Sequence, residues 1–132
     1  MGRQMDEWKL DFEWLRVRHI VKDSMDKNDL PDLQSILYLI GIQELGRWDP
    51  EKSFSKEEKQ DLMHVAVCTL LEEDGYFIFE GRDQDGWPHW KEDQRFSLKG
   101  IDEQEEYLKI KVIKYFDALE QLNGGFAEHE AV

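Results

Sequence analysis

The most apolar stretch of the chain is Leu33–Leu45, which reads LQSILYLIGIQEL. On a helix, its large apolar side chains do not keep to one stripe but cover most of the circumference, which is typical of a buried helix. The stretch is too short to span a bilayer, which takes about 20 residues. We therefore predict a central helix that the other elements enclose. Gly41 interrupts this helix, so we expect another backbone to approach closely there, and Gly46 is placed to form a left-handed C-terminal cap.

The first helix of the chain, predicted over residues 5–22, carries two apolar stripes on roughly opposite faces. The stripes are formed by Met5, Trp8, Phe12, Leu15 and His19 and by Leu10, Trp14, Val17 and Val21. Each stripe needs a surface to cover it. The helix is therefore either sandwiched within the monomer or presents one stripe to another chain, and Trp14 is one candidate binding residue.

Two further helices are predicted over about residues 56–73 and 103–122. Ser55 and Glu58 have the spacing of a capping box at the start of the first of these helices. The one cysteine of the chain, Cys68, lies in the apolar run of the same helix and permits no internal disulfide. We expect it to be a small core residue rather than a reactive thiol.

Between these two helices, at about residues 76–96, the apolar period changes from helical to alternating, which predicts a β-hairpin. Asp85-Gly86 is typical of a two-residue type I′ turn. With those two residues as the turn, Glu80 would face Lys91 across the strands.

The predicted fold is mainly α (α+β), with four helices arranged around the buried central helix and one β-hairpin between the third and fourth. A length of 132 residues suggests a single domain over residues 1–132, with about 123–132 as a frayed tail. No signal peptide or membrane-spanning segment is visible, so we expect a soluble, cytoplasmic protein without a membrane partner.

The net charge is −13, from 30 acidic and 17 basic residues, and the excess is spread along the chain. An acidic surface repels phosphate backbones and lacks the basic stripe of nucleic-acid binders. The charge therefore argues against nucleic acid as a partner. It favours high solubility or a basic partner.

Candidate chemistry is concentrated in the hairpin segment, residues 81–93. Its carboxylates partly match the spacing of a calcium loop, but Gly81 stands where the first carboxylate is needed and the flanks are strands instead of helices. We therefore expect no metal site. The weak metal candidates are Asp83, Asp85, His89 and Glu92.

Three large apolar residues, Trp87, Pro88 and Trp90, lie beside these charges and are candidate binding residues. Aromatic residues at a polar rim are typical of interface anchors, and equally of a hairpin packed onto helices. The sequence contains no phosphate loop, no GxSxG and no paired-histidine metal motif, so no cofactor is expected.

These features favour a non-enzymatic, acidic interaction module that binds a protein partner or self-associates. One alternative is a winged-helix-like regulatory or DNA-associated domain, because a helix followed by a two-stranded hairpin and another helix has that order of elements. A second alternative is an enzyme or metal site assembled from dispersed histidines and carboxylates.

Overall fold

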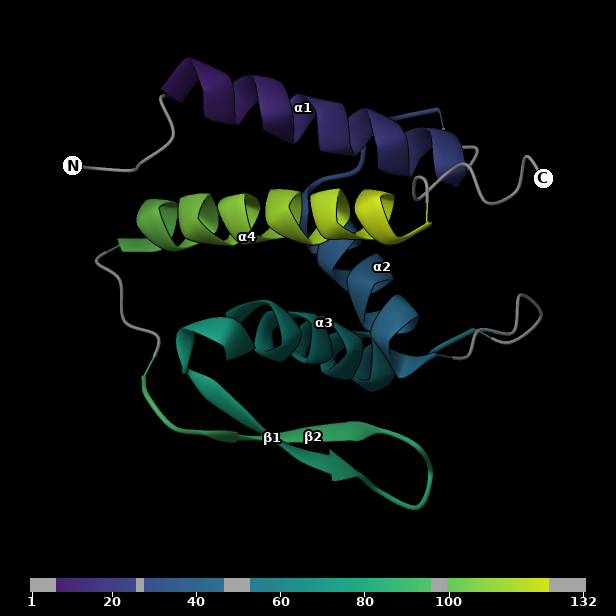
Figure 1. Ribbon diagram of the computed structural model, residues 1–132. Coiled ribbons are helices and arrows are strands. Elements are labelled where there is room, and N and C mark those ends of the chain that lie inside the picture. The colour runs from purple at the N-terminus through teal and green to yellow at the C-terminus, as the bar shows by residue number, and fades with distance from the viewer. Residues whose placement is uncertain (1–6, 26–27, 47–52, 96–99, 124–132) are drawn as a thin grey trace. The chain divides into compact units, whose positions relative to one another are not determined.

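The computed structural model describes residues 7–25, 28–46, 53–95 and 100–123 (Figure 1). Within these residues the chain forms four α-helices and a two-stranded antiparallel hairpin between α3 and α4, so the predicted mainly α fold with one hairpin is confirmed. The tail predicted at about 123–132 lies outside the described residues, apart from the last residue of α4. The elements are α1 (Glu7–Ser24), α2 (Leu33–Leu45), α3 (Lys56–Leu71), the short 3-10 helix η1 (Glu72–Asp74), β1 (Phe77–Arg82), β2 (Pro88–Glu92) and α4 (Gly100–Asn123).

The chain divides into two compact units. The first consists of residues 1–32 and 102–132 and contains α1 and most of α4. The second consists of residues 33–101 and contains α2, α3, η1 and the hairpin. In the described parts of both units, no helix is long and apolar enough to cross a membrane.

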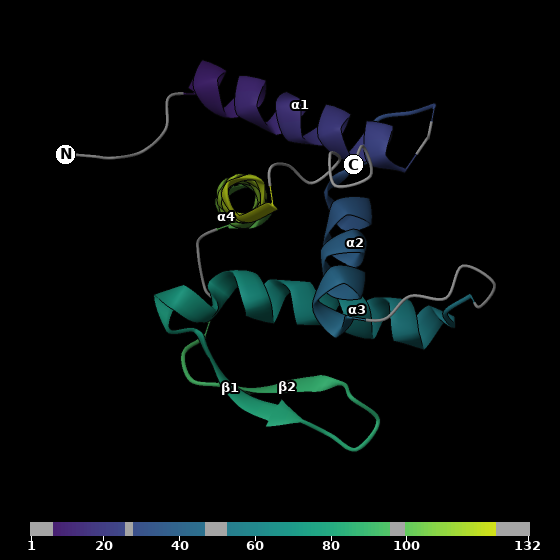
Figure 2. The ribbon, with the colours of Figure 1, turned by 45° about the vertical axis from the view of Figure 1, so that its right-hand side comes forward.

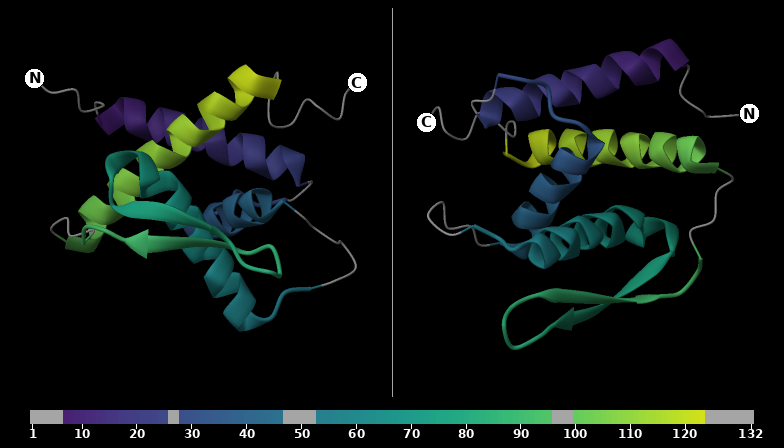
Figure 3. Two further views of the ribbon diagram at one scale, coloured as in Figure 1. Left: turned by 60° about the horizontal axis from the view of Figure 1, so that its bottom comes forward. Right: turned by 180° about the vertical axis from the view of Figure 1, so that it is seen from behind.

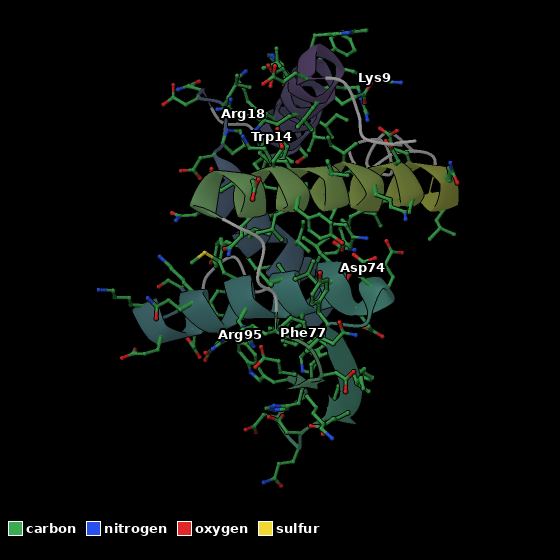
Figure 4. All side chains as sticks on the ribbon, turned by 90° about the vertical axis from the view of Figure 1, so that its left-hand side faces the viewer. Lys9, Trp14, Arg18, Asp74, Phe77 and Arg95 are labelled. Carbon is green, nitrogen blue, oxygen red and sulfur yellow. The ribbon has the colours of Figure 1, made fainter. Side chains whose placement is uncertain are left out.

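In the first unit, α1 lies across α4 (Figures 2 and 3), and the two helices are joined by charged side chains. Arg16 on α1 forms an ion pair with Asp117 on α4, with 2.8 Å between Nη2 and Oδ1. The ammonium of Lys109 on α4 lies 5.5 Å from the centre of the Trp14 ring. Trp14 points from α1 toward α4 (Figure 4), so this tryptophan contributes to packing within the unit.

The two stripes of α1 have different environments. Leu10, Trp14, Val17 and Val21 are buried, whereas the described members of the other stripe are exposed. Met5, which was predicted to belong to that stripe, lies outside the described residues. The exposed fractions are 70% for Trp8, 61% for Phe12 and 42% for Leu15. Trp14, the binding candidate predicted on α1, therefore belongs to the covered stripe. The exposed stripe contains none of the predicted binding residues.

In the second unit, α2 and α3 pack through direct backbone contact at Gly41. A Cβ atom built at Gly41 would overlap the backbone carbonyl oxygen of Leu62 on α3. Glycine therefore permits the two helices to approach at this point, as its position in an otherwise favourable helix predicted. Leu62 itself is fully buried.

The ends of these helices follow the sequence signals. At Gly46, which follows α2, φ is +86°, and its N–H donates to the carbonyl of Ile42 at 3.1 Å. At the start of α3, Ser55 Oγ accepts from the N–H of Glu58, whose carboxylate accepts from the N–H of Ser55. The left-handed cap and the capping box are both confirmed.

The hairpin register differs from the predicted one. The chain reverses through a three-residue loop, residues 84–86. In this loop the N–H of Gly86 donates to the Asp83 carbonyl, and the backbone of Gly86 has a φ of +89°. Asp83 N–H donates to the Trp87 carbonyl, which closes the loop. The two-residue type I′ turn is therefore wrong, and the structure has a loop of three residues that ends in a left-handed glycine.

A β-bulge at Glu80 accompanies this longer loop. Phe79 pairs with Trp90, but the next paired residue on β1 is Gly81, opposite His89. Glu80 is the extra residue, so it does not face Lys91, and the predicted charge pair is wrong. Gly81 has φ +114°, a backbone conformation that favours glycine.

We predict that Gly41→Ala destabilises the protein despite the higher helix propensity of alanine. Relief of the overlap with Leu62 requires α2 and α3 to separate, at a net cost of about 1–3 kcal/mol. Urea unfolding followed by circular dichroism measures this free energy. The exposed Gln43→Ala in the same helix is the control and should change stability by less than about 0.5 kcal/mol. A Gly41→Ala protein as stable as the parent would contradict the close approach.

Candidate functional site

A pocket of about 210 Å³ lies in the second unit, where the hairpin runs beside α3 (Figure 3). Pockets for drug-sized ligands have volumes of about 300–1,000 Å³, so this pocket fits a smaller group, such as one amino-acid side chain. It combines aromatic, acidic and basic groups from three helical elements, α2, α3 and η1, and from both hairpin strands. The lining residues are Glu44, Thr69, Glu72, Phe79, Arg82, Pro88 and Trp90.

The aromatic wall of the pocket is a cross-strand pair on the hairpin. Phe79 on β1 and Trp90 on β2 are register partners, with ring centroids 5.4 Å apart and planes at 61°. The indole Nε1–H of Trp90 donates to the Glu72 carboxylate at 3.0 Å. This bond fixes the orientation of the indole and holds β2 against the end of α3.

Arg82 connects the hairpin to the end of α2. Its guanidinium donates to the carbonyl oxygens of Glu44 at 2.8 Å and Leu45 at 3.2 Å, and to that of Gly86 at 2.8 Å. The last carbonyls of a helix lack partners within the helix and carry its partial negative charge. Arg82 therefore acts as a cationic C-terminal cap for α2.

The bulge determines which face of the hairpin carries Arg82. Side chains alternate along a strand, so Pro88 and Trp90 share one face of β2, and their register partners Arg82 and Phe79 share that face. Without the extra residue at Glu80, Arg82 would point to the opposite face from Phe79. The bulge therefore places the guanidinium and the aromatic pair on the same side.

The predicted binding residues are distributed among three environments. Pro88, which is buried, and the half-buried Trp90 line the pocket. Trp87 is half-buried and is not part of the lining, and Trp14 is buried in the first unit. Sequence reasoning missed Glu44, Thr69, Glu72, Phe79 and Arg82.

The weak metal candidates do not converge. Asp83 and His89 are joined by a 2.8 Å bond between Oδ2 and Nε2 at the exposed hairpin tip. Glu92, however, is opposite Phe77 at the other end of the ladder. Among the described residues there is no group of three or more histidines, cysteines and carboxylates that could hold a metal ion.

Asp83 organises the hairpin tip. His89 and the backbone N–H groups of Trp87 and Asp85 donate to its carboxylate, and these bonds lower the pKa of Asp83. Because ionised Asp83 accepts all of these bonds, the three-residue loop is favoured over the shorter turn. His89 is at the tip and is not part of the pocket lining.

Cys68 is fully buried in α3, and its Sγ lies 3.5 Å from Nε2 of His64. Burial, together with the nearby charges of Glu72 and Glu92, raises the pKa of its thiol to about 12. The thiolate is the nucleophilic form of cysteine, so this thiol is unsuited to nucleophilic chemistry near neutral pH.

We predict that Cys68 in the folded protein reacts with Ellman's reagent at pH 8 far more slowly than a free cysteine. The raised pKa keeps the thiol protonated, and its burial blocks access. Absorbance at 412 nm measures the reaction, with the urea-unfolded protein as the control that should react at once. Equal rates in the two states would contradict this account of the thiol.

We also predict that Arg82→Met destabilises the protein by about 1 kcal/mol, because it removes the bonds to the α2 carbonyls while keeping an apolar stem. Thermal and urea unfolding measure the loss. Arg95→Met, at an exposed position just after the hairpin, is the matched control and should change stability by less than about 0.5 kcal/mol. Equal effects of the two substitutions would rule out a capping role for Arg82.

Comparisons with known protein families, with curated proteins and with solved structures found no match for this chain.

Proposed function

We propose that the protein is an acidic protein-interaction module that binds a lysine or arginine side chain of a partner in the hairpin pocket. The observation that carries this proposal is the juxtaposition of the Phe79–Trp90 pair with the carboxylates of Glu44 and Glu72. A cation can lie against an aromatic face and beside a carboxylate at the same time.

The polar groups of the lining favour a basic occupant. The Thr69 hydroxyl donates its proton to the carbonyl of Val65 at 2.8 Å, so toward the pocket its oxygen can act as an acceptor. Glu72 accepts from Trp90 with one oxygen, and its other oxygen can accept a further bond. An ammonium or guanidinium group supplies the donors that these acceptors need.

Arg82 is the one cation among the lining residues, and it does not favour an anionic occupant. Its guanidinium is bound to three backbone carbonyls, two of them at the negative end of α2. The two carboxylates outnumber it in the lining, and the whole chain carries a charge of −13. Long-range attraction therefore acts on basic partners and opposes phosphate groups.

The volume limits the occupant to one side chain at a time. A cation–π contact at an exposed site contributes about 0.5–1 kcal/mol, and an exposed ion pair about 0.2–1 kcal/mol. A single lysine should therefore bind weakly. Useful affinity would come from a basic segment whose neighbouring residues add further contacts along the hairpin.

The test uses two short peptides, acetyl-Gly-Lys-Gly-amide and the same peptide with norleucine in place of lysine. ¹H–¹⁵N NMR follows the indole signal of Trp90, assigned with Trp90→Phe. We expect the lysine peptide at millimolar concentration to shift this signal, with added salt reducing the shift, and the norleucine peptide to leave it unchanged.

Glu72→Gln should raise the apparent dissociation constant roughly threefold to fivefold, because it keeps the acceptor for Trp90 but removes the charge. Glu105→Gln, on the exposed surface of α4, is the matched control and should leave binding unchanged. Equal shifts by both peptides, or shifts that spare Trp90, would refute a basic-side-chain site.

A further inference from the structure

We propose that two copies of this chain dimerise through the exposed face of α1, with the two helices antiparallel. This inference is independent of the hairpin pocket. Its starting point is the uncovered stripe of α1, which we call the outer stripe and define as Trp8, Phe12, Leu15 and His19. Three of its members are large apolar side chains with substantial exposure, while the opposite face of the helix is buried. Contiguous exposed apolar residues mark interaction surfaces.

The spacing of the outer stripe indicates that its occupant is another helix. Its residues recur at intervals of four, three and four, which is the a/d pattern of a helix–helix seam. Such a seam is narrow and convex, so it packs well beside another helix that has an a/d seam. Because α1 has such a seam, a second copy of α1 can be that helix.

The charges along α1 favour the antiparallel orientation. Its first half, residues 7–13, contains three acidic residues and one basic residue, and residues 16–23 contain three basic residues and one acidic residue. Two antiparallel copies place each acidic half beside a basic half. The helix dipoles are also opposed in that orientation, whereas a parallel pair would bring like charges together.

The heptad pattern fixes a specific register. Phe12 of each copy lies opposite Leu15 of the other, and Trp8 lies opposite His19. This register brings Asp11, which is exposed, beside Arg18 of the second copy on one edge of the seam. Arg18 donates to the carbonyl oxygens of Pro31 at 2.7 Å and Leu30 at 3.5 Å. These partners are neutral, so the positive charge of Arg18 remains to attract Asp11.

The other edge of the seam is compatible with this register. Lys9 and Arg18 lie on opposite sides of α1 (Figure 4), so Lys9 approaches Arg16 of the second copy. Arg16 is already paired with Glu13 and Asp117, each at 2.8 Å, and its Nη1 lies 3.9 Å from Glu120. The surroundings of Arg16 are therefore acidic overall and attract Lys9.

Sedimentation equilibrium of the full chain tests the dimer. We expect a dimer at tens of micromolar, and we expect Phe12→Asp to raise its dissociation constant more than tenfold. Leu122→Asp is the control, because Leu122 on α4 is 80% exposed and lies outside the outer stripe. A monomeric parent protein at 100 μM, or equal effects of the two substitutions, would overturn the proposal.

A charge exchange tests the orientation. Asp11→Arg and Arg18→Asp should each form homodimers at least tenfold more weakly, because each homodimer contains two like-charged pairs. Mixing the two variants should restore dimers, since the heterodimer contains two opposite-charged pairs. Circular dichroism checks that Arg18→Asp folds. If Arg18→Asp does not fold, the test of the register uses Asp11→Arg alone, because Asp11 is exposed and its substitution should not affect folding. Unchanged dimerisation of Asp11→Arg would then overturn the register. A mixture of two folded variants that stays monomeric would also overturn it.

Discussion

Gly41 brings the backbone of α2 against the backbone of α3 at Leu62, and this contact positions much of the second unit. A helix that is apolar over most of its circumference can pack in many orientations. The missing Cβ selects one orientation, because the two backbones can meet only at the glycine. The C-terminal end of α2 is then held at a defined place beside α3, and the carbonyls of Glu44 and Leu45 become available to the hairpin.

The β-bulge of the hairpin allows Arg82 to reach the C-terminal end of α2. Arg82 must share a face with Trp90 if it is to reach α2 while the Trp90 indole donates to Glu72 at the end of α3. The extra residue at Glu80 and the left-handed backbone of Gly81 produce this arrangement. The pocket follows from the same geometry, since its lining residues come from the hairpin strands, α2, α3 and η1.

The sequence predicted the local features well, because each depends on neighbouring residues. The helices, the capping box at Ser55 and the glycine cap of α2 were found from spacing and residue type alone. The hairpin register predicted from Asp85-Gly86 as the turn is wrong, because the Asp83 carboxylate accepts from the N–H groups of Asp85 and Trp87 and favours a longer loop.

The candidate site was predicted only in part, for a physical reason. Pro88 and Trp90 were found because large apolar residues beside charges are visible in the sequence. Glu44 and Arg82 were missed because their association depends on the bulge and on contacts between residues far apart in the chain. For α1, the spacing predicts both stripes, but two stripes of similar composition do not reveal which one is covered. The sequence alone therefore does not distinguish Trp14 from Trp8 as the exposed binding candidate.

The central claim, that α2 and α3 form a tightly packed pair, is tested most directly by amide hydrogen exchange resolved by NMR. The account predicts that the N–H groups around Gly41 and Leu62 are among the slowest to exchange, opening only with global unfolding. Exchange there as fast as at the exposed hairpin tip, residues 83–85, would contradict it.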